Sequence, residues 1–125
     1  MLRIIQRELG KSLIIQKRYK TFLPTHEWLT DDHPIKKIGI AKSGLEQLSE
    51  LVYIEYSVEK NDIIQEGEPL VILESVKATE EILAPFNSEI IDINENYDLD
   101  LINENPECED GAWLIKLKSI SKEEN

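Results

Sequence analysis

The sequence predicts a mostly β domain, built as a sandwich or flattened barrel with one or two short helices. Three observations predict it. Short apolar segments recur at close spacing from Thr21 onward, several of them alternate apolar with polar side chains, and breaks rich in Gly, Pro and Asn separate them. The 125 residues suffice for one domain with a single modest core.

The first half of this region predicts three strands and one short helix. Leu45 and Leu48 would share one face of the helix. In the third strand, alternation predicts that Val52, Ile54 and Tyr56 point to the same side. The strands are expected at residues 27–30, 35–40 and 51–56, the helix at residues 43–48, and a turn-rich break at residues 31–34.

A β-hairpin is the central feature of the second half. Its arms are residues 70–73 and 79–83, and the polar break between them places Lys77 at or beside the tip. A lysine at such a tip is most often a solubilising charge. The other expected features are turns at 61–62 and 66–67, a strand at 89–93 after the break at Pro85, an ambiguous helical turn or loop at 97–102, and a strand at 113–118 with Trp113, Ile115 and Leu117 inward.

The first 20 residues differ in composition from the rest of the chain. They hold six basic side chains and one acidic side chain, a net charge of +5, and Leu2, Ile5, Leu9 and Leu13 recur at helical spacing. This pattern is typical of an amphipathic organelle-targeting presequence, and it predicts a boundary between a presequence at 1–19 and a domain at 20–125. An ordinary amphipathic helix at the start of the domain is the alternative.

The remainder of the chain is strongly acidic. It holds 8 basic and 24 acidic residues, a net charge of −16, which disfavours binding to nucleic acid or to anionic membranes. Partners with basic patches and a purely solubilising role explain this charge equally well. Cys108 stands alone and has acidic neighbours, which excludes an internal disulfide and disfavours a reactive thiolate. His26 and His33 lack the spacing of a metal site.

Glu74-Ser75-Val76-Lys77-Ala78 resembles the lipoyl-attachment motif of the glycine cleavage system H protein family. Other blocks resemble that family in the same order along the chain, so the resemblance covers about residues 19–118. These blocks are His26-Glu27-Trp28, residues 38–41 and 46–48, Glu66-Gly67-Glu68, Ala84-Pro85, Ile93-Asn94-Glu95, Leu101-Ile102-Asn103 and residues 111–116.

The resemblance implies the barrel-sandwich hybrid fold of lipoyl and biotinyl carriers, in which two small sheets pack together and one hairpin presents a lysine. It implies that Lys77 carries lipoate through an amide bond. It also implies that Glu74 helps the modifying enzyme to recognise the turn, although a solvated turn charge is the alternative. Ser75 and Val76 would set the shape of the turn, and the small Ala78 would keep the approach to Lys77 open.

The implied function is that of a non-catalytic carrier in a relay. A pyridoxal-phosphate glycine decarboxylase would load an aminomethyl group onto the lipoyl arm, a tetrahydrofolate-dependent aminomethyltransferase would collect it, and a flavin-containing dihydrolipoyl dehydrogenase would reoxidise the arm. A lipoate-attaching enzyme is a further implied partner. A monomer in the mitochondrial matrix or a mitochondrion-related organelle is expected.

In the family, the loaded arm also parks against the surface of its own carrier. The sequence does not identify the cleft that would receive it. His26 is one candidate for lining this cleft, and a capping or packing role for His26 is the favoured alternative.

Three other functions stay open on the sequence. A lipoyl relay that donates lipoate to 2-oxoacid dehydrogenases would need the same Lys77, and an unmodified interaction module would keep the same fold. A lipoyl domain of a 2-oxoacid dehydrogenase or a biotin carrier fits less well, because Met-Lys-Met is missing and the blocks at 26–28 and 111–116 are present. A free-standing enzyme has the least support, since no nucleophile or acid–base pair stands at usable spacing.

The chain departs from the family pattern at three places. Asn87-Ser88-Glu89 replaces Ser-Gly-Glu, and Asn87 is expected to tolerate the left-handed conformation that the glycine would supply. Gly44-Leu45 stands where the family prefers Ala-Gln. The family often continues into a C-terminal helix, whereas this sequence stops at Asn125, a difference that bears on partner docking and not on Lys77.

Overall fold

The computed structural model describes residues 2–6, 13–17, 20–30 and 34–120. Within these ranges the strands form two main antiparallel sheets and one separate pair, as predicted for a β-sandwich. The larger sheet has the order β3 (Lys20–Phe22), β4 (Glu27–Thr30), β5 (Ile35–Ile40), β11 (Ile115–Ser119), β10 (Ser88–Ile93) and β7 (Ile63–Ile64). The smaller sheet has the order β6 (Leu51–Tyr56), β8 (Pro69–Ser75) and β9 (Thr79–Leu83).

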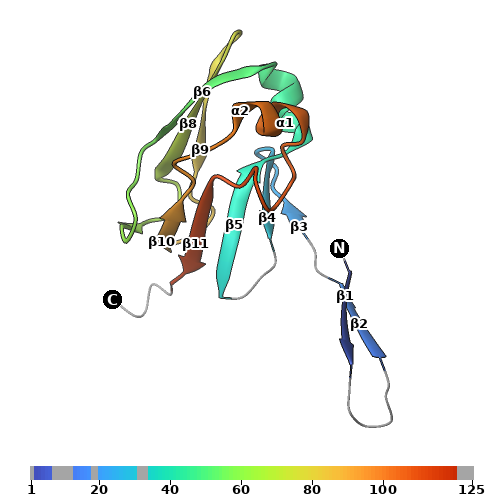
Figure 1. Ribbon diagram of the computed structural model, residues 1–125. Helices are drawn as coiled ribbons and strands as arrows, with labels where there is room; N and C mark the ends of the chain where they lie inside the picture. The colour runs from blue at the N-terminus through green and yellow to red at the C-terminus, as the bar shows by residue number, and fades with distance from the viewer. Residues whose placement is uncertain (1, 7–12, 18–19, 31–33, 121–125) are drawn as a thin grey trace.

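The two main sheets face each other and share one hydrophobic core (Figure 1). Helices α1 (Lys42–Leu48) and α2 (Leu99–Glu104) lie toward the end of the molecule where the β8–β9 hairpin projects. Burial of apolar side chains from both sheets supplies the main stabilising free energy. The core includes Leu29, Ile38, Ile40, Ile54, Leu70, Leu73, Ile82, Ile90, Leu114, Ile115 and Leu117, all buried.

Trp28 packs on the outer face of the larger sheet, away from this core. The residue opposite it on β5 is Gly39, where a Cβ atom would lie 2.5 Å from the indole ring. The indole Nε1 donates a 2.8 Å hydrogen bond to the carbonyl oxygen of Pro106, and the Lys20 ammonium lies 5.1 Å from the ring centroid. Trp28 therefore attaches the segment that follows α2 to the sheet, and all four residues of β4 are buried.

A β-bulge changes which side chains of β6 point inward. Leu51 lies opposite Ser75 and Tyr53 lies opposite Glu74, so Val52 is an extra residue without a partner on β8. Leu51 and Ile54 are buried whereas Val52 is 48% exposed. The prediction that Val52, Ile54 and Tyr56 share one side is wrong at Val52, because a bulge shifts the alternation by one residue.

The start of the chain also differs from the helical spacing read from its sequence. Leu2–Gln6 (β1) and Leu13–Lys17 (β2) are strands that pair with each other. In the register of the two strands Ile4 is the partner of Ile15 and Ile5 is the partner of Ile14, and β-branched residues favour strands. Whether residues 1–19 serve as a presequence is a separate question that this pairing does not test.

Three other expectations need correction or completion. Trp113 is half-buried and precedes β11, because that strand begins only at Ile115. Asn87 does not adopt a left-handed conformation; its side-chain oxygen accepts a 2.8 Å hydrogen bond from the Glu66 amide. The ambiguous segment at 97–102 contains the start of α2. Among the described residues, no helix is long and apolar enough to cross a lipid bilayer.

Asp98 caps the N-terminus of α2. Its carboxylate accepts hydrogen bonds from the amides of Asp100 (3.0 Å) and Leu101 (3.2 Å), which have no acceptor within the helix. We expect Asp98→Ala to lower the free energy of unfolding by about 1 kcal/mol in chemical denaturation. Asp98→Asn keeps an acceptor and should lose much less. Equal losses in the two variants would contradict the capping role.

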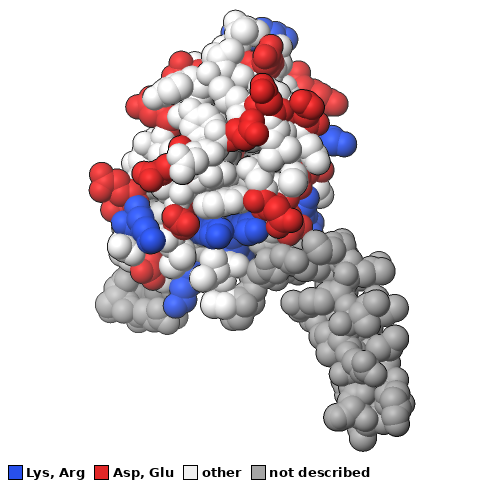
Figure 2. All heavy atoms as spheres, in the orientation of Figure 1, with Lys and Arg blue, Asp and Glu red and all other residues white. Residues whose placement is uncertain are grey.

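Charge is distributed unevenly over the surface. In Figure 2 most of the visible basic side chains gather at the end of the molecule opposite the hairpin tip, and acidic side chains dominate elsewhere. Lys37 of β5 and Lys116 of β11 lie directly opposite each other, a repulsive arrangement. Lys37 donates to the Glu109 carbonyl oxygen at 3.1 Å, and the Lys116 ammonium lies 4.7 Å from the Trp113 ring centroid. These contacts offset part of the repulsion.

Candidate functional site

The tip of the β8–β9 hairpin consists of residues 75–78 and presents Lys77 to solvent. Ser75 shapes this turn. Its hydroxyl oxygen accepts hydrogen bonds from the amides of Lys77 (3.1 Å) and Ala78 (3.0 Å) and donates to the Ala78 carbonyl oxygen (3.0 Å). The Ser75 amide donates to the same carbonyl at 2.9 Å. One hydroxyl thus uses its donor and both acceptor positions to fix the backbone that carries Lys77.

The neighbours of Lys77 differ in exposure, and one of them ties the tip to the segment before β6. Val76 is exposed, and its amide donates a 3.3 Å hydrogen bond to the Glu50 carbonyl oxygen, which ties the tip to the start of β6. Glu74 is half-buried and lies opposite Thr79. Within the described part of the chain, Lys77 makes no side-chain hydrogen bond or ion pair. Its amine is therefore accessible to an enzyme.

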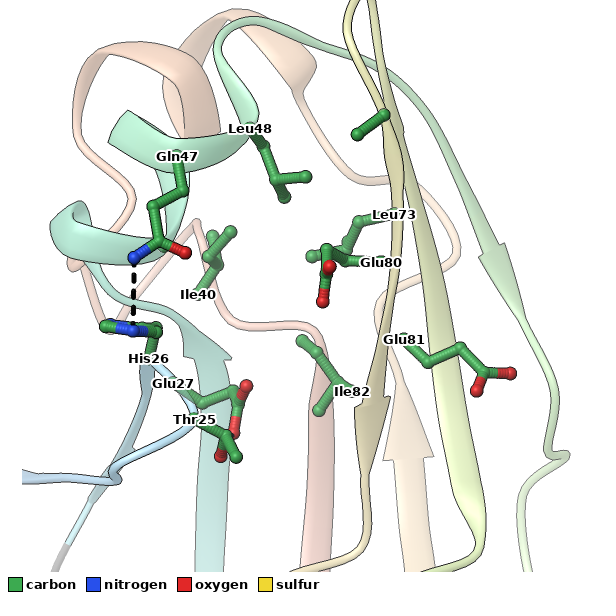
Figure 3. Close-up of a pocket in the computed structure, with 12 residues that line it drawn as sticks. Thr25, His26, Glu27, Ile40, Gln47, Leu48, Leu73, Glu80, Glu81 and Ile82 are labelled. Carbon is green, nitrogen blue, oxygen red and sulfur yellow. Dashed lines mark hydrogen bonds between the residues drawn. The ribbon is translucent and has the colours of Figure 1, made fainter.

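A cavity of about 190 Å³ lies beside the hairpin, between the inner face of β8–β9 and helix α1. Figure 3 shows Ile40, Leu48, Leu73 and Ile82 converging on it. Ala78, directly after Lys77, belongs to its lining. These four side chains give the cavity an apolar wall, and the cavity begins next to the lysine. The full lining is Thr25, His26, Glu27, Ile40, Gly44, Gln47, Leu48, Leu73, Ala78, Glu80, Glu81 and Ile82.

Two carboxylates give this cavity a polar, acidic side. Glu80 lies opposite Leu73 on the inner face of the sheet and points toward the cavity, whereas the side chain of Glu81 points away from it (Figure 3). Glu27 is only 6% exposed and accepts a 2.5 Å hydrogen bond from the Thr25 hydroxyl. A cavity with an apolar wall and an acidic side fits an aliphatic chain that ends in a cation.

Burial raises the pKa of the Glu27 carboxyl above its ordinary value of 4.5. The hydroxyl of Thr25 and the charge of His26 lower this pKa, and the negative charge of Glu80 raises it further, but burial dominates. Because the pKa is higher in the folded than in the unfolded protein, the folded state binds more protons between the two values. The free energy of unfolding therefore decreases as the pH rises through this interval.

Glu27→Gln is expected to remove this pH-dependent loss. The free energy of unfolding of the variant minus that of the parent should be larger at about pH 7 than at about pH 4. The reason is that the parent must form a buried charge at the higher pH, whereas the glutamine has none to form. Denaturant unfolding at the two pH values measures the difference. Glu81→Gln removes one exposed charge and serves as the control. A stability difference between parent and Glu27→Gln that is the same at both pH values would contradict the assignment.

His26 holds the wall of the cavity in place. Its backbone has a φ of 72°, a left-handed conformation that histidine tolerates better than most residues. Its ring contacts the Ser43 hydroxyl at 2.8 Å and the Gln47 amide nitrogen at 3.3 Å, both on α1. His26 thus has a packing role and also lines the cavity. The glycine at position 44 fits here because a Cβ atom would lie 2.8 Å from the His26 carbonyl oxygen.

The structure brings together residues that the sequence did not connect. Glu27 belongs to the segment His26-Glu27-Trp28, but the sequence does not predict that its side chain is buried. The burial results from the pairing of β4 with its neighbours in the sheet. Glu80 enters the site through its register opposite Leu73. Among the described residues, no group of three or more His, Cys, Asp or Glu side chains could hold a metal ion.

Comparisons with known proteins agree on one family. The family model described as glycine cleavage H-protein matches residues 20–125. A glycine cleavage system H protein of Prochlorococcus marinus subsp. pastoris is 38% identical over 104 residues, covering 82% of this chain and 79% of the relative. One from Thermotoga maritima is 34% identical over 103 residues, covering 81% of each.

A solved structure has the same fold. The crystal structure of a glycine cleavage system H protein from Mycobacterium marinum aligns with a TM-score of 0.70, covering 82% of this chain and 84% of that one. At 22% identity this likeness supports the fold alone, and it agrees with the barrel-sandwich hybrid expected from the sequence.

Proposed function

The chain belongs to the glycine cleavage H-protein family, and from this premise we propose that it carries lipoate on the Nζ atom of Lys77 and shuttles the aminomethyl group of glycine. The observation that carries the proposal is the hairpin tip. Lys77 stands exposed in Glu74-Ser75-Val76-Lys77-Ala78, on a turn fixed by the Ser75 hydroxyl and next to a cavity with an apolar wall and an acidic side. The protein acts as a carrier, and its enzymes are separate proteins.

The residues at the tip and in the cavity fit a lipoyl group. When bound, the group would supply a disulfide that opens on reduction, so that one sulfur takes the aminomethyl cargo and the other becomes a thiol. Lys77 supplies the amine for the amide bond, and the rigid turn fixes the point from which the arm swings. Ile40, Leu48 and Leu73 present an apolar surface to an aliphatic arm, and the carboxylates of Glu27 and Glu80 face a cationic cargo. Burial of the cargo there would exclude water from it.

The proposed partners follow from this role. They are a glycine decarboxylase that uses pyridoxal phosphate, an aminomethyltransferase that uses tetrahydrofolate, dihydrolipoyl dehydrogenase with its flavin, and the enzyme that attaches lipoate. The net charge of −11 would attract partners with basic surfaces. We propose that the carrier is a monomer that meets each partner in turn.

Residues 1–19 are proposed to be a presequence that directs the chain to the mitochondrial matrix or a mitochondrion-related organelle. Two facts support this proposal: the segment is basic, and the family match begins at residue 20. The relatives quoted above are bacterial proteins, so they provide no support for import. Sequencing of the N-terminus of protein from its native source would test it.

Reconstitution separates the carrier from a lipoyl relay. Lipoylated protein is mixed with glycine, the decarboxylase, the aminomethyltransferase, tetrahydrofolate, dihydrolipoyl dehydrogenase and NAD⁺. A carrier gives glycine-dependent NADH formation that requires the lipoylated protein. A relay gives none, and instead transfers its lipoyl group to the apo lipoyl domain of a 2-oxoacid dehydrogenase in the presence of a lipoyl-transferring enzyme.

The Ser75 hydroxyl is expected to matter for modification more than for stability. Ser75→Ala removes three hydrogen bonds at the tip, which should lower the free energy of unfolding by only about 1 kcal/mol because the turn is solvated. It should lower kcat/KM for lipoylation of Lys77 several-fold, because the lysine then samples several positions. Initial rates by intact mass measure this effect. Ser75→Thr keeps the hydroxyl, so its kcat/KM for lipoylation should stay close to that of the parent. A loss as large as that of Ser75→Ala would contradict this role of the hydroxyl.

A further inference from the structure

An exposed apolar surface lies on β6 beside the hairpin tip, and the carrier function proposed above does not use it. We call it the β6 bulge patch and define it as Val52, Tyr53 and Val76, which are 48%, 50% and 67% exposed. Two consecutive apolar residues of a strand do not normally both face solvent, since successive side chains point to opposite faces. The β6 bulge patch therefore needs a specific cause.

The bulge in β6 is that cause. Val52 is the extra residue between two partnered positions, so Val52 and Tyr53 both turn outward while Leu51 and Ile54 on either side stay buried. β6 is an edge strand of the smaller sheet. The bulge lies where β6 pairs with Glu74 and Ser75, and the Val76 amide binds the Glu50 carbonyl oxygen. The apolar surface is thus held next to Lys77 by backbone hydrogen bonds.

Three acidic residues lie near the β6 bulge patch, and Lys77 directly follows Val76. Glu74 lies directly opposite Tyr53, and Glu50 and Glu55 are exposed on the same strand region. Across the outer face of this sheet, Glu55 lies opposite Ile72, which lies opposite Glu81. The basic side chains on β5 and β11 belong to the other sheet, at the far end of the molecule (Figure 2). An apolar centre with a polar rim is the usual anatomy of a protein-binding surface, and apart from Lys77 these neighbours give the rim a negative charge.

We propose that the β6 bulge patch is the docking surface for the enzyme that attaches lipoate to Lys77, and that this enzyme offers an apolar surface ringed by Lys or Arg. This inference rests on the proposed lipoylation of Lys77. The partner residues that meet Glu50, Glu55 and Glu74 should be positively charged, because charges across an interface are usually complementary. Among the proposed partners, the lipoate-attaching enzyme is the one that must come closest to the tip, because an unmodified lysine side chain is short.

Before modification, Lys77 extends from the turn by only its own side chain, so the acylating enzyme has to seat against the tip itself. Enzymes that act at the end of the finished arm can stay farther away. In the transfer, the unprotonated Nζ attacks the carbonyl carbon of a lipoyl adenylate made from lipoate and ATP. The C–N amide bond forms, the bond from that carbon to the phosphate oxygen breaks, AMP leaves, and one proton passes to solvent.

The test measures lipoylation of the full chain by a purified ATP-dependent lipoate ligase from the same organism. Initial rates at increasing carrier concentration, followed by intact mass, separate kcat from KM. The double variant Val52→Thr/Tyr53→Thr places a β-branched residue, which favours a strand, at both positions but removes the apolar surface. Glu55→Lys reverses one charge of the rim. Ile63→Thr removes an exposed apolar side chain on β7 of the other sheet and is the matched control.

We expect kcat/KM to fall roughly tenfold in the double variant, mostly through KM, because aromatic anchors carry much of an interface's binding energy. Glu55→Lys should lower kcat/KM several-fold and weaken its dependence on salt. Ile63→Thr should stay within about twofold of the parent. Unfolding curves check that each variant is folded.

Parental kcat/KM in the folded double variant would overturn the proposal. If lipoylation keeps its parental kcat/KM but glycine-dependent NADH formation is lost, the β6 bulge patch binds a different partner. That outcome would also overturn the proposal. A parent protein that the ligase leaves unmodified at Lys77 would instead contradict the proposed function.

Discussion

Lys77→Arg is expected to abolish lipoylation and, with it, all glycine-dependent turnover in the reconstituted system. Arginine keeps the positive charge and much of the length of lysine, but its guanidinium stays protonated and does not act as an acyl acceptor. The exposed tip should tolerate the change, so the free energy of unfolding should shift by less than about 0.5 kcal/mol. Intact mass after incubation with ligase, ATP and lipoate reads the loss directly.

Lys60→Arg is the matched control for this substitution, because Lys60 is also exposed and lies in a turn region outside the hairpin. It should gain one lipoyl group at the parental rate. A lipoyl group found on Lys77→Arg would place the attachment at another lysine and would contradict the assignment of the tip.

Trp28→Ala is expected to cause the largest loss of stability of any substitution considered. Trp28 is fully buried, fills the space above Gly39 and donates a hydrogen bond to Pro106. Removal of a buried tryptophan costs about 3–5 kcal/mol, a large share of the roughly 5–15 kcal/mol that stabilises a typical domain. Chemical denaturation should give a midpoint far below that of the parent, and the segment after α2 should lose protection from hydrogen exchange.

A double-mutant cycle tests whether the cost arises from the Trp28–Gly39 contact. Gly39→Ala alone should also destabilise, because its Cβ would lie 2.5 Å from the indole ring. In Trp28→Ala/Gly39→Ala the new methyl group meets no ring, so the combined loss should be smaller than the sum of the single losses. Trp28→Phe should fall between the parent and Trp28→Ala. Additive losses would show that the two residues do not act on each other.

Periodicity and turn residues predicted the parts of the fold that depend on local sequence. The arms of the hairpin, the helix at α1 and the strand at β10 lie within about two residues of their predicted positions. The position of Lys77 at the tip follows from the sequence, because a short polar break between two apolar segments is typical of a hairpin turn. The helix α2 could have been predicted from Asp98, an N-cap residue before an apolar stretch.

Features that depend on pairing between distant strands could not be predicted. The bulge at Val52 arises from a register shift in the pairing of β6 with β8, and no residue type within β6 predicts it. The cavity beside Lys77 needs Glu27 from β4 and Glu80 from β9, which meet only when the two sheets pack. At the N-terminus, the spacing of Leu2, Ile5, Leu9 and Leu13 predicts a helix, whereas the β-branched isoleucines favour the strands β1 and β2 that the structure shows.

Intact mass with peptide mapping of the protein from its native source shows whether Lys77 carries lipoate. We expect a mass excess of one lipoyl group on the peptide that contains Lys77. The same experiment identifies the native N-terminus and so tests the proposed presequence at residues 1–19. Native protein with a bare Lys77 would contradict the carrier function and would favour an unmodified interaction module of the same fold.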